Sequence, residues 1–380
     1  MVIDPDDNPL SFPILEHVQR FPSLKHVLQS VGAAHLNYFA PEKLSVCLEE
    51  RSTALRLLIN DLSSPKDNLL PLFLSVFIIG LSTAWTNGPE FDFGQQHLQG
   101  ARALVDMVIE QSTIDGTQPL YTNLIIGSYL YWDMATAFLV PFDQQTPLNT
   151  NDIYLTVLRM EHEYHPIGGY ATGIFYLISN VGRYCRSVIE TGIRDEPLES
   201  ALEEEMMHWE PNRDNHELST ISDAFRSHGL LSLAGICYRR RKPEMDQHAI
   251  LSAIINTTTE EDFAGWQSVE ASFFDQDLEE SIRDRALDVV SSLLSIPSSH
   301  PCTNLQAIPL FTAASELSNL DEDKRARVQQ RFKELYSLNH LPANLAALQI
   351  LPEIWERRDT GETTNWLEVM LEKKWNLMLG

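Results

Sequence analysis

The amino-acid sequence predicts an all-α fold, either a multi-helix bundle or an irregular α-solenoid, in a single extended domain. Apolar residues recur at helical spacing along most of the chain, whereas alternation of apolar and polar residues over strand lengths is nearly absent. The 380 residues are 43% hydrophobic, which is enough for a large core, and no Gly/Ser-rich or Pro-rich linker divides them. We therefore expect one helical domain over residues 1–380.

Proline and turn residues set the limits of the helices predicted in the N-terminal half. Pro22 and Pro41 open helices, and the Asn-Gly-Pro sequence at residues 87–89 is a strong stop signal. Residues 120–140 are apolar nearly all round, so other helices should surround them. Residues 154–158 could pass for a strand, but an isolated strand has nothing to pair with. The predicted helical segments are 12–38 with a break at 21–22, 41–62, 69–85, 95–110 and 120–140.

The C-terminal half contains acidic stretches followed by a terminal helical block. Residues 257–277 are polar and rich in turn formers, so they are predicted to form a mobile acidic loop. The apolar residues 341–355 are a candidate face for a homodimer, although burial in the core is the favoured interpretation. The terminal block comprises residues 305–316, 321–335, 345–359 and 366–379.

The charge balance argues against direct contact with nucleic acid. Lys and Arg number 28 and Asp and Glu number 53, which gives a net charge of −25. Binding to duplex DNA depends largely on Lys and Arg that neutralise phosphates, so this chain is a poor direct partner for it. The basic run at residues 239–242 is interpreted as a charged last helical turn, with a nuclear address as the alternative.

Cysteine usage and hydropathy indicate a protein of the cytoplasm, the nucleus or both. The four cysteines are far apart in the sequence and include no CxxC pair, which excludes a binuclear zinc cluster and argues against a disulfide framework. The first fifteen residues carry three aspartates and lack a basic segment, unlike a signal peptide. The most apolar stretch, residues 69–85, is shorter than the roughly 20 residues that a membrane span needs. We expect no membrane association.

One group of aromatic and polar residues is the candidate ligand site. Tyr129 and Asp133 are four apart and share a helix face, and a cleft lined by aromatics with a few polar groups is typical of small-molecule sites. The structural interpretation is favoured: the tryptophans fill the core, and Asp133 is a buried carboxylate paired with Arg102 or His97. The group comprises Trp85, Phe91, Phe93, His97, Arg102, Tyr129, Trp132 and Asp133.

A second polar cluster, Glu-His-Glu-Tyr-His at residues 161–165, does not amount to a metal site. Its two histidines are three residues apart, unlike the HExxH of zinc proteases, and the Pro-Ile-Gly-Gly sequence that follows favours a solvated loop. The chain also contains no GxSxG, P-loop or GxGxxG motif. We therefore expect neither a metal nor a cofactor.

Several fragments occur in the order and spacing of one family. They are IPLFTAASE at 308–316, EIWERRDTGE at 353–362, NWLEVMLEKKW at 365–375, IGLSTAW at 79–85, HLQGARAL at 97–104 and YLYWDMATA at 129–137. With an Asn-Pro-Leu opening at residue 8, the chain resembles the regulatory domain of fungal zinc-cluster (Zn2Cys6) transcription factors over residues 8–379, here without the zinc cluster. Each fragment alone is mostly apolar spacing, whereas their order together is specific.

The resemblance implies a helical domain that senses a hydrophobic small molecule or a partner protein and gates transcription. Relatives with sterol-responsive or drug-responsive behaviour are consistent with a ligand pocket, but the family supplies no catalytic residues to carry over. The alternative is a stand-alone protein of a fungal secondary-metabolite pathway that binds a hydrophobic intermediate or catalyses its isomerisation or cyclisation. In that case Asp133, His97 and Tyr129 would be the catalytic residues, with Asp133 or His97 exchanging a proton.

Overall fold

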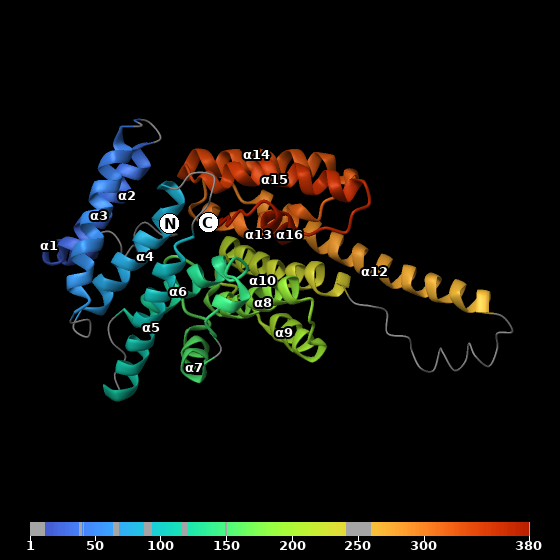
Figure 1. Ribbon diagram of the computed structural model, residues 1–380, viewed down its shortest axis with the longest axis horizontal. Coiled ribbons are helices and arrows are strands. Elements are labelled where there is room, and N and C mark those ends of the chain that lie inside the picture. Colours follow the sequence, from blue (N-terminus) through green and yellow to red (C-terminus); the bar gives the residue numbers. More distant parts are fainter. Residues whose placement is uncertain are drawn as a thin grey trace.

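The computed structural model confirms the predicted all-α class. It describes residues 12–37, 40, 42–63, 68–86, 93–115, 121–148, 150–240 and 260–379, with side chains outside this description at 12–13, 85–86, 113–115 and 260–276. Within these ranges every regular element is a helix, apart from a single bridge between His165 and Gly169. The predicted bundle is irregular, with helices packed at several different angles (Figure 1).

The N-terminal helices start and stop largely where the sequence indicated. Pro22 is the first residue of α2, and the break predicted beside it separates α1 from α2. Helix α4 packs against α2 and α5, which buries most of its apolar surface as expected for the most apolar stretch. The helices are α1 (Phe12–Arg20), α2 (Pro22–Asn37), α3 (Lys43–Asp61), α4 (Leu69–Thr86), α5 (Gln95–Asp115) and α6 (Thr122–Thr136).

Helix α6 lies at the centre of the molecule and connects the N-terminal helices to the middle of the chain. It packs against α5 on one side and α8 on another, and nearly all of its residues are buried. The next helices begin at side-chain caps, because Thr150, Asp195 and Asn215 each accept a hydrogen bond from a backbone N–H of the first turn. They are α7 (Asn151–Met160), α8 (Thr172–Thr191), α9 (Glu196–His208) and α10 (His216–Ile236).

The C-terminal helices form a layer over α10. Helix α13 packs against α10 and α12, and α14 and α15 lie side by side above it (Figure 1). Asn365 caps α16 through a reciprocal capping box with Glu368. The chain then runs without a helix along residues 373–379. The helices are α12 (Glu260–Ser295), α13 (Ala307–Ser315), α14 (Glu322–Asn339), α15 (Pro342–Asp359) and α16 (Trp366–Glu372).

One local prediction is confirmed and another needs correction. Residues 154–158 belong to α7, which agrees with the argument against an isolated strand. The acidic loop predicted at 257–277 is wrong from Glu260 onward, because that residue begins α12, whose first part extends away from the other helices (Figure 1). Residues 257–259 lie outside the described residues. The acidic residues from Glu260 onward suit a solvated helix as well as a loop, which explains the error.

The two described arginines of the basic run, Arg239 and Arg240, lie in the 3-10 turn directly after α10, as the interpretation of a charged last helical turn predicts. Arg239 is only 4% exposed in its side chain and pairs with Glu279 of α12 and with the buried Glu316 at the end of α13. Arg240 pairs with Glu368 of α16. These arginines therefore connect the end of α10 to three later helices, and the alternative of a nuclear address stays a prediction. Residues 241 and 242 lie outside the described residues.

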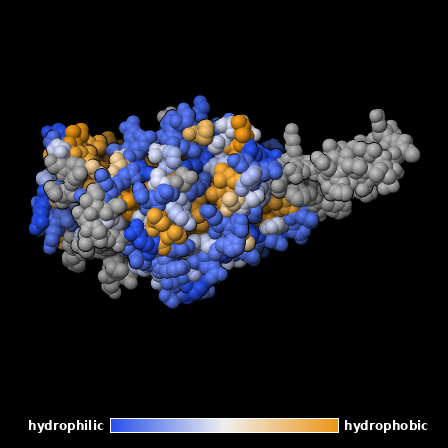
Figure 2. Space-filling model, turned by 90° about the horizontal axis from the view of Figure 1, so that it is seen from below, coloured by the Kyte–Doolittle hydropathy of each residue, from blue (hydrophilic) through white to orange (hydrophobic). Residues whose placement is uncertain are grey.

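One face of the molecule is mainly polar. Hydrophilic residues cover most of the face in Figure 2, and hydrophobic residues form small separate patches on it. The candidate homodimer face at 341–355 is largely used within the chain, since Ala347, Ile350 and Ile354 of α15 are fully buried. None of the helices that the structure describes combines the length and the apolar character required to cross a bilayer.

Candidate functional site

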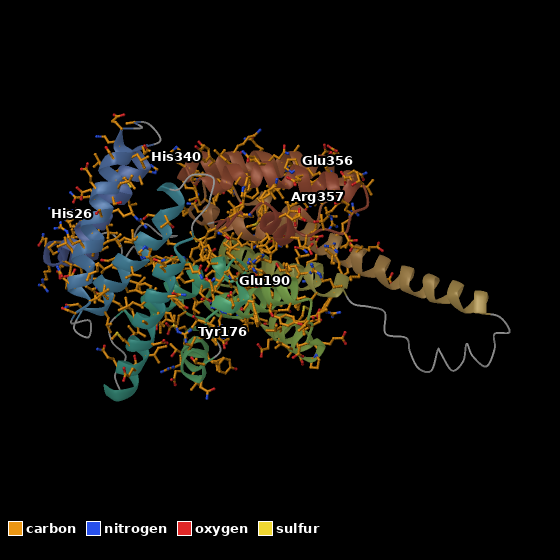
Figure 3. The ribbon with its side chains drawn as sticks, viewed as in Figure 1. His26, Tyr176, Glu190, His340, Glu356 and Arg357 are labelled. Carbon is orange, nitrogen blue, oxygen red and sulfur yellow. The ribbon has the colours of Figure 1, made fainter. Side chains whose placement is uncertain are left out.

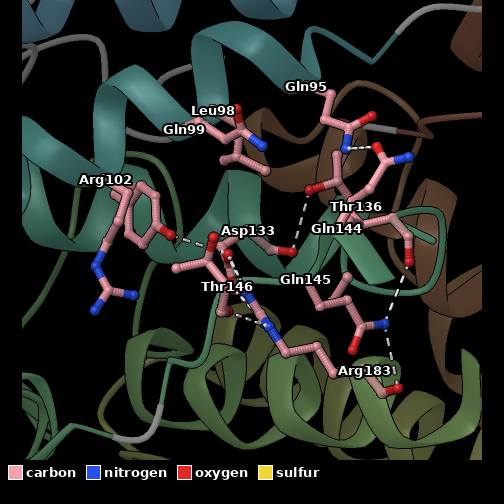
Figure 4. A pocket seen from close by; sticks show the side chains of 13 residues that line it. Gln95, Leu98, Gln99, Arg102, Asp133, Thr136, Gln144, Gln145, Thr146 and Arg183 are labelled. Atoms are coloured by element: carbon pink, nitrogen blue, oxygen red, sulfur yellow. Dashed lines mark hydrogen bonds and ion pairs between the residues drawn. The ribbon is translucent and has the colours of Figure 1, made fainter. Parts of the chain in front are cut away.

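A small cleft opens between α5, α6, α8 and the loop at residues 140–147 (Figure 4). We call it the polar cleft. Its volume is about 20 Å³, which suffices for one or two water molecules. It is lined by Gln95, Leu98, Gln99, Arg102, Tyr129, Asp133, Thr136, Ala137, Val140, Gln144, Gln145, Thr146 and Arg183.

A buried ion pair forms the floor of the polar cleft. Asp133 is 1% exposed, and its Oδ1 and Oδ2 accept hydrogen bonds from Nη2 and Nη1 of Arg183 at 2.6 and 2.8 Å. The Tyr129 hydroxyl donates to Asp133 Oδ1 at 3.1 Å, as the four-residue spacing predicted. Two parallel donors from one guanidinium are the strong, planar form of this interaction. The arrangement fixes the carboxylate in one orientation.

The ion pair also sets the protonation states. Burial by itself would raise the pKa of Asp133, but the charge and hydrogen bonds of Arg183 lower that pKa below its usual value. Burial and the neighbouring Asp133 carboxylate raise the pKa of Tyr129. At neutral pH Asp133 is therefore ionised and Tyr129 is a neutral donor. Neither group titrates near pH 7, so these shifts do not favour the acid–base roles predicted for them.

The partner expected for Asp133 is different in the structure. Asp133 pairs with Arg183 of α8, and not with Arg102 or His97. Arg102 instead donates through Nε to Asp106 at 2.9 Å and through Nη1 to the Pro147 carbonyl at 2.9 Å. Arg102 thus lies at the edge of the polar cleft and ties α5 to the loop. The correction has a simple cause, because α8 is about fifty residues away in sequence and crosses α6 only in the fold.

The other predicted residues divide into two groups. Trp132 faces away from the polar cleft: its Nε1 donates to the Phe93 carbonyl at 3.2 Å, and its ring meets that of Phe77 edge-on. A Cβ built on Gly80 would lie 3.2 Å from the His97 Cβ, which places His97 beside α4. Phe93 is buried in the core. The side chains of Trp85 and Phe91 lie outside the description. Ligand binding by this group stays a prediction.

The loop at 140–147 closes the remaining side of the polar cleft. Gln95 Nε2 donates to Gln144 Oε1 at 2.8 Å, and Arg183 Nε donates to the Thr146 carbonyl at 2.9 Å. The Phe142 N–H donates to the carboxylate of Glu190, which Figure 3 labels near the end of α8. With the bond from Arg102 to the Pro147 carbonyl, the loop is therefore attached to α5 at two points and to α8 at several.

Sequence reasoning missed Arg183 and the loop glutamines. The available signal for Arg183 was its position four residues after Ser179 on α8, whose largely apolar buried face also carries Arg186. A polar pair on such a face indicates a buried partner. Nothing in the spacing of Gln144 and Gln145 distinguishes them from ordinary loop residues. Their role depends on where the loop folds back.

The described residues contain no group of three or more metal-binding side chains. His165, from the Glu-His-Glu-Tyr-His cluster, is buried against α6, and its Nε2 lies 3.3 Å from the Leu124 carbonyl. Its Nδ1 accepts from the N–H groups of Ile167 and Gly168. Burial lowers the pKa of His165 to about 4. This histidine therefore holds the loop 165–169 onto α6 in its neutral form.

Comparison with models of protein families gave a match over the whole chain. A model of the fungal specific transcription factor domain matches residues 1–380. The chain belongs to this family. The resemblance inferred from the ordered sequence fragments is thereby confirmed, and the family indicates a regulatory role. A search of curated proteins and a search of solved structures each gave no significant match.

Proposed function

We propose that this fungal transcription factor domain is an effector-sensing regulatory domain that acts in the nucleus and binds a small molecule at the polar cleft. The family match supports the regulatory role. The buried Asp133–Arg183 pair beside a solvent-accessible cleft is the observation that carries the choice of site. A fixed charged pair with a neutral Tyr129 donor gives an effector defined hydrogen-bonding groups at neutral pH.

The size of the polar cleft implies that an effector must open it. Typical ligand pockets have volumes of roughly 300–1,000 Å³, whereas this cleft has about 20 Å³. The contact between Gln95 and Gln144 spans its rim and has no charged partner. Breaking that contact would let the loop move while the salt bridge beneath stays intact. Apolar parts of an effector would then meet Leu98, Ala137 and Val140.

Such an effector controls the domain only if it binds the open and closed forms with different affinity. The closed form has the Gln95–Gln144 contact, and the open form has the larger pocket. Two alternatives, a partner protein and an isomerisation or cyclisation reaction, stay predictions, since no contact of the polar cleft favours either.

The test links the full chain to a heterologous DNA-binding module and measures a reporter gene in a fungal cell. We expect output that differs from that of the module alone. Gln144→Ala should change this output several-fold at equal protein level, because it removes the rim contact. Gln96→Ala is the matched control, since Gln96 is exposed on α5 and does not line the polar cleft.

Two results would contradict the proposal. The first is a reporter that responds to the fusion no more than to the DNA-binding module. The second is equal output from the wild type, Gln144→Ala and Gln96→Ala at equal protein level. Fluorescence microscopy of the full chain tests the nuclear location separately.

A further inference from the structure

A second cavity lies on the other side of α6 from the polar cleft. We call it the apolar cavity. It has a volume of about 30 Å³ and is lined by the end of α6, α10, α13, α16 and the C-terminal residues. Aromatic rings form its walls: Phe138 meets His228 and Trp366 with ring centroids 5.3 Å apart in each case, and Phe311 meets Trp366 at 6.0 Å.

Two ring nitrogens at the apolar cavity have no hydrogen-bond partner among the described residues. They are Nε2 of His228 and Nε1 of Trp366, on side chains that line the cavity and are 2% and 6% exposed. Buried polar atoms are nearly always paired, so two unpaired nitrogens beside one cavity are available to a small polar group that enters it. Trp355 differs from Trp366 in this respect, because the Trp355 Nε1 donates to the Ala314 carbonyl at 2.7 Å.

The chemistry of these nitrogens defines what could pair with them. An indole N–H only donates, so Trp366 requires an acceptor. His228 Nδ1 lies 2.8 Å from the Thr312 hydroxyl, which leaves Nε2 as a donor or an acceptor according to the tautomer. A hydroxyl oxygen could accept from Trp366 and pair with His228 in either tautomer. Burial lowers the pKa of His228 to about 3, so the imidazole is neutral and a neutral ligand suits it.

We propose that the apolar cavity is a binding site for a small, neutral, mainly apolar molecule that carries one hydroxyl or carbonyl oxygen. The oxygen pairs with Trp366 and His228, and the apolar part lies among the aromatic rings. Binding at this cavity does not depend on the function proposed for the polar cleft, and the two are tested by different measurements.

The C-terminal residues provide the way in. Leu377 and Leu379 line the apolar cavity and are 4% and 5% exposed. Among the described residues, no backbone hydrogen bond fixes residues 376–379, whereas Lys373, Lys374 and Trp375 bond back to α16. The end of the chain is therefore held by apolar contacts. A ligand larger than a water molecule could displace these leucines and replace their contacts with its own.

The test uses the full chain with ¹⁵N-labelled tryptophan indoles and the matched probes phenol and benzene, which differ by one hydroxyl group. Trp366→Phe assigns the Trp366 signal. We expect phenol to shift the Trp366 indole resonance saturably, with an affinity roughly 10-fold above that of benzene, because only phenol supplies the acceptor. The Trp355 resonance should stay in place, since its N–H is already paired.

Variants of the cavity walls separate binding from folding. Leu377→Ala should raise the affinity for phenol, and His228→Phe should lower it by roughly 10-fold. If His228→Phe does not fold, Thr312→Val removes only the hydroxyl that orients His228 and should also weaken phenol binding. The proposal is overturned if neither probe shifts Trp366 saturably, in which case the cavity takes at most water. Equal affinity for phenol and benzene would overturn the pairing with the oxygen.

Discussion

The polar cleft and the apolar cavity lie on opposite sides of one short segment, residues 133–140, at the end of α6. Four of these residues line the polar cleft and the other four line the apolar cavity. The two sets follow helical spacing, so about two turns of chain present a different face to each side. The polar cleft receives Asp133, Thr136, Ala137 and Val140, whereas the apolar cavity receives Met134, Ala135, Phe138 and Leu139.

The difference between the two sites is how completely their polar atoms are paired. In the polar cleft the Asp133 carboxylate has partners for both oxygens. In the apolar cavity the ring nitrogens of His228 and Trp366 have none among the described residues. A site whose polar atoms are all paired is rigid, and its stability depends on every member. An unpaired donor in an apolar site can still form a hydrogen bond with a ligand. Four sets of measurements, one of which varies the pH, test this contrast.

The largest effect is expected at the ion pair of the polar cleft. Arg183→Met leaves the buried Asp133 carboxylate without its counter-ion and should lower the free energy of unfolding by about 3–5 kcal/mol. The double variant Asp133→Leu with Arg183→Met should recover most of that loss. Urea denaturation measures both. Arg213→Met is the control, because Arg213 is 61% exposed in its pair with Asp223 and such pairs contribute about 1 kcal/mol or less.

A loss below about 1 kcal/mol for Arg183→Met would show that Asp133 accepts solvent as a substitute partner. The polar cleft would then be open and loosely organised. The contrast with the apolar cavity would not hold.

The second effect tests the packing of α6 against α4, where Gly80 meets the ring of Trp132. A Cβ at Gly80 would lie 2.1 Å from the Trp132 ring, so Gly80→Ala forces that ring to move and should cost about 3 kcal/mol. Gly100→Ala is the matched control, since the nearest atom lies 3.8 Å away, and helix propensity predicts a gain of up to about 1 kcal/mol. Thermal and urea unfolding should rank the two variants in opposite directions. Equal stability of both would mean that the segment shifts freely.

The two sites should also differ in their response to acid. Burial lowers the pKa of His228 to about 3 in the folded chain. In the unfolded chain this histidine becomes protonated near pH 6.5, whereas in the folded chain it stays neutral at that pH. Stability from this group is complete above pH 6.5 and is lost as the pH falls, by about 2 kcal/mol between pH 7 and pH 5. The pKa of Asp133 is lowered, so its contribution is lost only below about pH 4.

Urea denaturation of the wild type and His228→Gln at pH 7 and pH 5 measures this term. The variant should lose about 2 kcal/mol less than the wild type across that interval. His165 contributes a similar loss to both proteins and cancels in the difference. An identical loss in the two proteins would show that His228 is protonated in the folded chain and that the cavity is more polar than its walls suggest.

The smallest effect compares two tryptophans. Trp355→Phe removes a donor and leaves the Ala314 carbonyl without its partner, whereas Trp366→Phe removes an N–H that has no protein partner. Both side chains are similarly buried, at 5% and 6% exposed. Trp366→Phe should therefore cost about 1 kcal/mol less in the free energy of unfolding than Trp355→Phe. Equal costs would argue that the Trp366 N–H already has a bonded partner.

The sequence was sufficient for the helices because its signals are local. Proline at the start of α2, the turn residues after α4 and the caps of later helices act within a few residues of where they stand. The prediction failed at Glu260, where acidic residues suit a solvated helix as well as a loop. The pairing of Tyr129 with Asp133 was also local, since both lie on one face of α6.

The sequence by itself determined the all-α class, the family and the shared face of Tyr129 and Asp133. Tertiary structure alone decided that Arg183 is the partner of Asp133, that Trp132 turns toward α4, and that His228 and Trp366 meet at one cavity. These outcomes depend on which helices cross, and helix crossings are set by side-chain packing between segments far apart in the chain. Spacing within a helix fixes which residues share a face, but only the packed fold fixes what that face meets.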